Sequence, residues 1–189
     1  MADAIRILQA EHVNMAKVLA VLDAEMKVFH ELGKLDLDLL FTIIDYIESF
    51  PDEFHHPKEE RLLFDVLARR NPQAKPLIDE LRAEHSEGKE LIAGLKAAVE
   101  ALSIEAPMNK AEFEKTVSDY TAFVREHMRK EETALFPLAR ESLEAEDWSA
   151  IDREFAENED PMFSGAVDER YQELLRRIVY LSLPPFAED

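Results

Sequence analysis

Apolar residues along this chain recur every three or four positions and seldom alternate, which is the periodicity of amphipathic α-helices. Interruptions at Gly33, at Asn71-Pro72 and before Pro107 divide this pattern into long stretches. The sequence therefore predicts long helices at about residues 3–32, 36–69, 74–102 and 109–143.

Short connections of a few residues make consecutive helices antiparallel, so the predicted fold is all-α, an up-down-up-down four-helix bundle formed by residues 1–145. Residues 146–189 are expected to form a short C-terminal helical extension that packs on the bundle. Its helices are predicted at about 147–155 and 168–181, with 158–161 as a loop and Pro184-Pro185 in a tail. The expected contacts are Trp148, Phe155, Tyr171 and Leu174.

Two prolines interrupt the second predicted helix. Pro51 and Pro57 each lack a backbone donor, so a kink or a restart is expected there, with Ser49 as a candidate N-cap. This distortion would lie directly beside His55 and His56.

Two segments of the chain occur twice. Ala10-Glu11-His12 recurs 73 positions later as Ala83-Glu84-His85. Residues 55–64 (HHPKEERLLF) recur 72 positions later as residues 127–136 (HMRKEETALF). We interpret the chain as two copies of a helical hairpin, each with one histidine on its first helix and H-x-x-x-E-E on its second.

The repeat predicts that its histidines converge. His12 and His55 lie 22 and 21 residues from a turn near residue 34, and His85 and His127 each lie 21 residues from a turn near residue 106. Because all helices rise by about 1.5 Å per residue, the four imidazoles are expected at one height.

Glutamate follows histidine by four positions, on the same helix face, at His55/Glu59 and at His127/Glu131. The pair His56/Glu60 has the same spacing, but the alignment of the two copies favours the first register. The next glutamates, Glu60 and Glu132, point elsewhere and are expected to be solvated or to accept a ring N–H from a ligand histidine.

Buried carboxylates and imidazoles would be unstable without a compensating cation. So many N and O ligands exceed what one tetrahedral zinc ion takes, which favours two metal ions bridged by Glu59 and Glu131. The candidate ligands are His12, His55, His56, Glu59, His85, His127 and Glu131. Two divalent ions with only two carboxylates keep a net positive charge, which favours reversible O2 binding or sensing over committed oxidation.

Composition narrows the possible partners. The 189 residues include 41 acidic and 22 basic ones, for a formal charge of −19, which argues against nucleic acid and anionic membranes as partners. The absence of Cys excludes disulfides and thiolate metal sites. No stretch is long and apolar enough to span a membrane, and Met1-Ala2-Asp3-Ala4 lacks a signal pattern, so a cytoplasmic location is expected.

Over about residues 1–145 these motifs resemble the hemerythrin-like, HHE cation-binding family. The matching segments are His12, His55 to Phe64, Glu84-His85, and His127 to Pro137. The resemblance implies a four-helix bundle with two iron ions bridged by oxo or hydroxo groups and carboxylates, and other divalent metals are compatible with it. Family members carry, store or sense O2, or respond to nitric oxide, peroxide or iron.

One position departs from the oxygen-carrying members, which have a second histidine one turn after the third-helix histidine. Here that position is Lys89, and His56 is the candidate substitute. This departure favours sensing, iron handling or redox chemistry over oxygen transport. Met15, Tyr120 and Phe123 lie within two turns of the ligands and are expected to be core residues or to line a ligand pocket.

The leading hypothesis is therefore a non-enzymatic di-iron protein that binds or senses O2 or a related small oxidant, or handles iron. One alternative is a di-iron redox enzyme that acts on peroxide or nitric oxide. The other alternative is a metal-dependent interaction module, for which the sequence indicates no particular protein partner.

Overall fold

The computed structural model describes residues 3–104, 109–155, 160–163 and 167–182, and every regular element in these residues is helical. The α-helices are α1 (Asp3–Leu32), α2 (Leu37–Ser49), α3 (His56–Lys58), α4 (Asp65–Arg70), α5 (Lys75–Ser103), α6 (Lys110–Lys130), α7 (Phe136–Ser142), α8 (Ala145–Phe155) and α9 (Gln172–Leu181). Three π-helical segments are η1 (Pro51–His55), η2 (Glu59–Phe64) and η4 (Glu131–Leu135). Two 3-10 turns are η3 (Pro72–Ala74) and η5 (Glu169–Tyr171).

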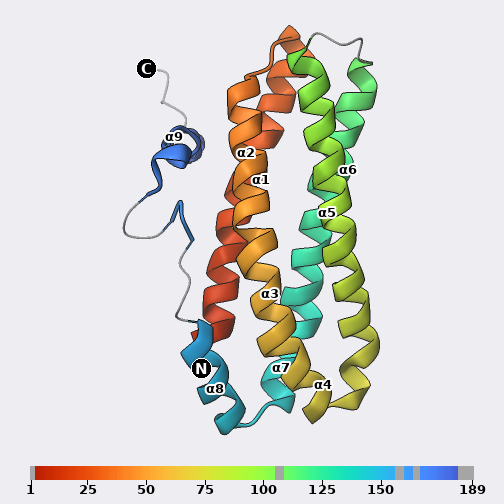
Figure 1. The fold of residues 1–189 in the computed structure, drawn as a ribbon, viewed down its shortest axis with the longest axis vertical. Coiled ribbons are helices and arrows are strands. Elements are labelled where there is room, and N and C mark those ends of the chain that lie inside the picture. Colours follow the sequence, from red (N-terminus) through yellow and green to blue (C-terminus); the bar gives the residue numbers. More distant parts are fainter. Residues whose placement is uncertain (1–2, 105–108, 156–159, 164–166, 183–189) are drawn as a thin grey trace, which may run out of the picture.

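The long helices lie side by side (Figure 1). α1 contacts α2 and α6, and α5 likewise contacts α2 and α6. The first turn follows the local sequence, because Gly33 takes a φ of +67° and its N–H donates to the carbonyl of Phe29. Asp36 then caps α2 through Leu39 N–H at 3.1 Å. The all-α prediction and the first helix are confirmed.

The second and fourth predicted helices each contain π-helical turns. Pro51 begins η1, so the predicted distortion is present, but Ser49 does not cap it. Its hydroxyl lies 2.7 Å from the Tyr171 hydroxyl and bonds back to the Tyr46 carbonyl instead. In the second copy η4 occupies the position equivalent to η2, and such π-turns are frequent at functional sites.

Two apolar clusters fill the interior on either side of a band of polar residues. One cluster includes Leu19, Ile43 and Val117, and the other includes Leu8, Leu63 and Leu135. Along each long helix, the buried residues that separate the positions of one cluster from those of the other are chiefly histidines and glutamates of the repeated motifs. The helices therefore support a polar centre with apolar packing at both ends.

The C-terminal elements lie against the first copy of the repeat. α8 contacts α1 and η2, and α9 contacts α1 and α2 (Figure 1). Phe155, Tyr171 and Leu174 are buried, and Trp148 is partly buried against the cluster that contains Phe155. The predicted Pro184-Pro185 tail and residues 158–159 of the predicted loop lie outside the described residues.

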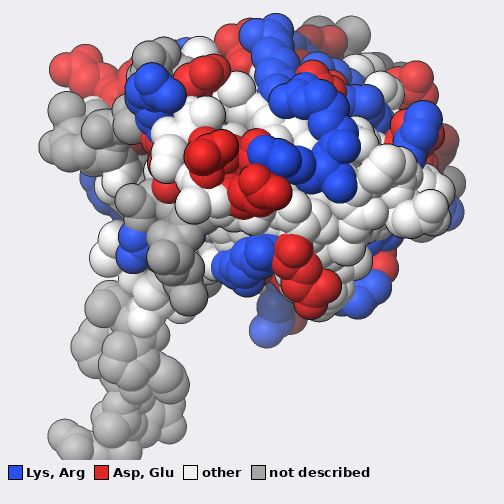
Figure 2. Space-filling view, turned by 90° about the horizontal axis from the view of Figure 1, so that it is seen from below, with Lys and Arg blue, Asp and Glu red and all other residues white. Residues whose placement is uncertain are grey.

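At the end of the molecule where α4, α7 and α8 meet, basic and acidic side chains are intermixed (Figure 2). Arg70 pairs with Asp147 and Arg82 with Asp65. None of the helices in the described residues combines the length and apolar composition of a bilayer-spanning segment.

Candidate metal centre

The structure brings together all seven histidines and glutamates that the sequence singled out. They come from α1, the η1–α3–η2 region, α5 and the α6–η4 junction. Within each of three groups, the potential ligand atoms lie within 4.8 Å of one another: His12/His55/Glu59/Glu131, Glu59/His85/His127/Glu131 and His56/His85/His127. We call these seven residues the His/Glu cluster; whether they bind metal stays a prediction.

The cluster holds polar atoms that the described protein leaves unsatisfied. Within that part of the chain, the buried side-chain N and O atoms without a hydrogen-bond partner are Nε2 of His12, His55, His85 and His127, Nδ1 of His56, and both carboxylate oxygens of Glu59 and Glu131. Glu59 and Glu131 are each 0% exposed. Burying such atoms without partners is costly, so their convergence fits a cation between them.

In four of the five histidines, the ring nitrogen that points away from the other ligand atoms contacts a glutamate outside the cluster. Four Nδ1 atoms face glutamate oxygens, at 3.0 Å for His12–Glu132, 2.7 Å for His55–Glu11, 2.7 Å for His85–Glu60 and 2.8 Å for His127–Glu84. This contact keeps the proton on Nδ1 and leaves the inward Nε2 free to bind a metal, the usual arrangement at metal-bound histidines.

The repeat explains this outer layer. Glu11 and Glu84 immediately precede the first-helix histidines and bind the second-helix histidine of their own copy. They also pair with lysines at equivalent positions, Glu11 with Lys58 at 3.2 Å and Glu84 with Lys130. Sequence reasoning assigned these residues no role, although both repeated segments contained them.

The sequence predicts that Glu60 and Glu132 are either solvated or accept a ring N–H from a ligand histidine. The second of these alternatives is confirmed as a contact. Each accepts from a ring N–H of the opposite copy, Glu60 from His85 and Glu132 from His12. Glu60 is in none of the ligand groups that the described residues form, whereas Glu59 is in two. The geometry therefore agrees with the His55/Glu59 register.

The cluster attracts positive charge. Burial opposes protonation of His12, but the carboxylates of Glu131, 3.2 Å from Nε2, and of Glu132, which accepts from Nδ1, outweigh it and raise its pKa to about 10. The pKa of His85 is raised to about 10 in the same way by Glu131 and Glu59. Burial would raise the pKa of Glu131, but its histidine partners hold it well below the usual range.

His56 has a different environment. Its Nδ1 lies 3.2 Å from Asp52 Oδ1, without the angles of a hydrogen bond, and its ring stacks on His85 with centroids 4.2 Å apart. Burial and the neighbouring histidines hold the pKa of His56 well below its ordinary value, so it is an uncharged imidazole. Lys89 is exposed, so His56 is the nearer candidate for a fifth histidine ligand.

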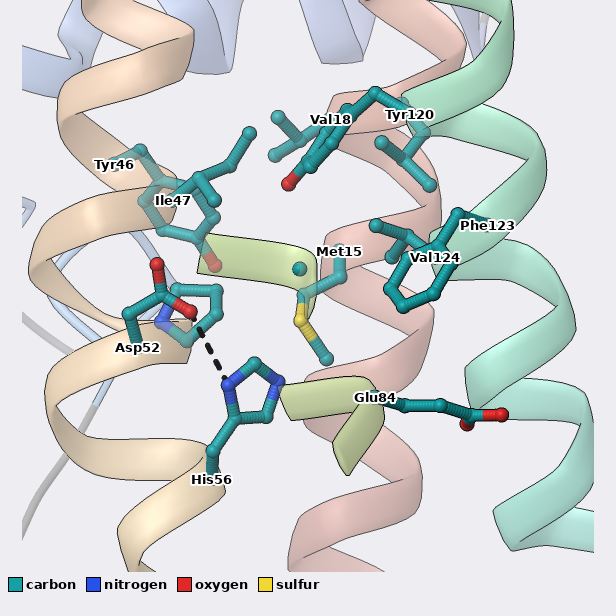
Figure 3. Close-up of a pocket in the computed structure, with 13 residues that line it drawn as sticks. Met15, Val18, Tyr46, Ile47, Asp52, His56, Glu84, Tyr120, Phe123 and Val124 are labelled. Atoms are coloured by element: carbon teal, nitrogen blue, oxygen red, sulfur yellow. Dashed lines mark ion pairs between the residues drawn. The ribbon is translucent and has the colours of Figure 1, made fainter. Parts of the chain in front are cut away.

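A small cavity of about 40 Å³ adjoins the cluster on this side. It is lined by residues from α1, α2, η1, α3, α5 and α6, and Figure 3 shows His56 and Asp52 on one wall and Phe123 and Val124 on the other. Met15, Tyr120 and Phe123 all line it, and Met15 and Tyr120 are also buried core residues. That this cavity takes a ligand stays a prediction.

The comparisons with known proteins agree with this geometry. The family model described as the hemerythrin HHE cation-binding domain matches residues 3–139. A search of curated proteins found no match.

Proposed function

We propose that this chain, which belongs to the hemerythrin HHE cation-binding family, holds two iron ions in the His/Glu cluster and uses them to bind or sense O2 or a related small oxidant. The proposed ligands are His12, His55, His56, Glu59, His85, His127 and Glu131. No catalytic residue is assigned.

The observation that carries this proposal is the set of buried atoms without partners. Eight of these nine atoms, all except His56 Nδ1, belong to two groups of four residues that share Glu59 and Glu131. Two cations that share two carboxylates would satisfy these eight atoms, whereas one cation would leave several unsatisfied.

The donor set supports iron. Imidazole nitrogens outnumber carboxylates, which suits iron, zinc or copper better than magnesium or calcium. A centre with few carboxylates keeps positive charge and gives less stabilisation to the oxidised ions, which favours reversible binding or sensing. Lys89 at the position of a carrier's histidine argues for sensing or iron handling over transport.

The proposal includes the up-and-down order of the helices and the division of the chain into a bundle and an extension. We infer an up-down-up-down bundle for residues 1–145, supported by the closed series of contacts α1–α2–α5–α6–α1, with residues 146–189 as an extension. In the described residues, its helices α8 and α9 contact chiefly the first copy of the repeat.

Anaerobic loading with ferrous iron followed by exposure to air tests the function. We expect about two irons per chain by mass spectrometry and new near-ultraviolet absorption bands after O2 is added. His127→Ala should lower the iron content, whereas His30→Ala should not, because His30 is exposed and pairs only with Glu114 in the described residues. Less than one iron per chain with no spectral change would refute the proposal.

A redox enzyme that acts on peroxide or nitric oxide is the second candidate, favoured by the cavity beside His56. Turnover of peroxide at tens per second or more, lost in His127→Ala, would support it. Turnover no faster than that of free iron would exclude it.

A further inference from the structure

Four glutamates surround the His/Glu cluster without belonging to it. Each has a carboxylate oxygen within hydrogen-bond distance of the Nδ1 atom of one cluster histidine, and we call these four the outer carboxylates: Glu11, Glu60, Glu84 and Glu132. A count of direct ligands leaves their charge out. Because negative charge close to a metal centre stabilises the more highly charged ion, the outer carboxylates by themselves would favour ferric over ferrous iron.

Two of the outer carboxylates are paired with a lysine, in the same way in both copies of the repeat. Glu11 divides its two oxygens between His55 Nδ1, at 2.7 Å, and Lys58 Nζ, at 3.2 Å. The second copy repeats this arrangement with its equivalent residues, Glu84, His127 and Lys130. Each lysine therefore offsets a negative charge that faces a proposed ligand histidine.

The other two outer carboxylates have different partners. Glu132 accepts from the uncharged amide of Gln9 at 2.7 Å, and Gln9 in turn accepts from the exposed Arg140 at 3.4 Å. The Glu60 side chain is 38% exposed. Among the described residues, no lysine or arginine forms an ion pair with Glu60 or Glu132. The lysines thus offset only half of the charge of the outer carboxylates.

The two lysines differ in how strongly solvent screens their charge. Lys58 is 6% exposed and lies 5.9 Å from the ring centroids of Phe50 and Phe155. Lys130 is 19% exposed and also pairs with Glu80 on the surface of α5. Buried charges are screened less than partly exposed ones, so Lys58 should act more strongly on the metal centre than Lys130.

We propose that Lys58 and Lys130 are positioning residues that offset two of the outer carboxylates and thereby favour ferrous iron at the proposed centre. Neither lysine is a metal ligand, and each acts through the glutamate that it pairs with. The inference rests on the proposed function, because it requires iron in the His/Glu cluster.

The reduction potential of the iron-loaded, full-length protein tests the proposal. In a titration with ferricyanide, reversed with dithionite and followed by near-ultraviolet absorption, each step is the loss of one electron from one ferrous ion to the titrant. We expect Lys58→Met to lower the potential by about 60 mV, a tenfold change in the ferrous/ferric equilibrium. Lys130→Met should lower it by about 30 mV, a threefold change. Lys58→Arg keeps the charge and should restore the wild-type potential.

Gln9→Lys is the converse variant. It places an ammonium group where Glu132 accepts from an amide, so it should raise the potential by about 30 mV, a threefold change. Gln9 is partly exposed, so the new charge stays in contact with solvent. Lys115→Met is the control and should keep the wild-type potential. Lys115 is exposed, pairs with Asp119, and lies roughly 18 Å along α6 from His127.

The direction of each shift decides the outcome. An unchanged or higher potential in Lys58→Met overturns the proposal, and so does an unchanged or lower potential in Gln9→Lys. If Lys58→Met does not fold, the same result in Lys130→Met takes its place. A merely structural role of Lys58 would lower the iron content of Lys58→Met without moving the potential of the iron that stays bound.

The two proposals fail differently. A wild-type protein that takes up less than one iron per chain counts against the proposed function and against the role of the lysines together. A wild-type protein that binds two irons, with a potential that responds to neither Lys58→Met nor Gln9→Lys, counts against the role of the lysines alone.

Discussion

The two copies of the repeated hairpin share one framework around the His/Glu cluster but differ in what surrounds it. In each copy a glutamate beside the first-helix histidine holds the second-helix histidine and a lysine. The first copy adds Asp52 and His56, where the second copy has Val124 and Met128. The shared residues form most of the proposed metal cage. Asp52 and His56 line the cavity beside it, and His56 is also a proposed metal ligand.

The copies also differ in their exposure to solvent. Lys58 is 6% exposed and lies near the rings of Phe50 and Phe155, the latter from α8. Lys130 is 19% exposed and also reaches Glu80 on the surface of α5. The C-terminal elements therefore bury the outer layer of the first copy more deeply than that of the second.

The largest expected effect separates the two lysines. Lys58→Met should destabilise the protein by about 3 kcal/mol, because it leaves a buried carboxylate without its cation. Lys130→Met should cost less than about 1 kcal/mol, because its ion pairs are partly solvated. Urea unfolding of both variants measures the difference, and equal losses would contradict the contrast in burial.

The outer carboxylates should instead behave alike in the two copies. Glu11→Gln and Glu84→Gln each keep an acceptor for the ring N–H but lose its charge, so each should weaken metal binding about 10–100-fold. Glu87→Gln, an exposed change on α5, is the control and should have no effect. Metal titration measures the affinities. An effect in one copy only would show that the framework is not shared.

Making the first copy resemble the second should affect one metal ion. His56→Met places there the residue found at Met128, and we expect the affinity for one of two ions to fall about tenfold while the other is retained. Titration with Co2+, followed by its visible absorption, resolves the two binding steps. Equal weakening of both steps would contradict the grouping of the His56 ligand atom with those of His85 and His127.

The sequence predicted what depends on local periodicity and on repetition. Helix spans follow from the spacing of apolar residues, and α1 and α5 begin and end within one residue of the prediction. The convergence of His12, His55, His85 and His127 followed from equal heights in repeated hairpins. Both arguments need only the rise per residue and short turns.

What the sequence did not predict depends on contacts between helices. The pairing of Glu11 with His55 crosses from α1 to η1, and nothing in either segment alone indicates it. The π-turns are marked by proline at η1 but not within η4, so their hydrogen-bonding pattern is not readable from composition. The cavity depends on side-chain volumes from several helices, which no single stretch determines.

The smallest expected effect concerns the C-terminal segment that covers the first copy. Asp160 is buried and accepts hydrogen bonds from the Tyr46 hydroxyl at 2.9 Å and from Met162 N–H at 3.0 Å. The position equivalent to Tyr46 in the second copy is the exposed Ser118. Tyr46 also lines the cavity beside the His/Glu cluster, so this contact joins the C-terminal segment to the wall of that cavity.

Burial raises the pKa of Asp160, and its hydrogen bonds only partly oppose this. The folded state therefore favours the protonated acid, so the stabilisation is fully present below the ordinary pKa of aspartate, about 3.9, and is lost as pH rises through the raised value. Asp160→Asn carries an uncharged group at every pH. The stability of the wild type relative to this variant should thus decrease from pH 3 to pH 7, measured by thermal melts of both proteins. A difference that grows with pH would mean that the charged form of Asp160 is the one that the C-terminal segment stabilises.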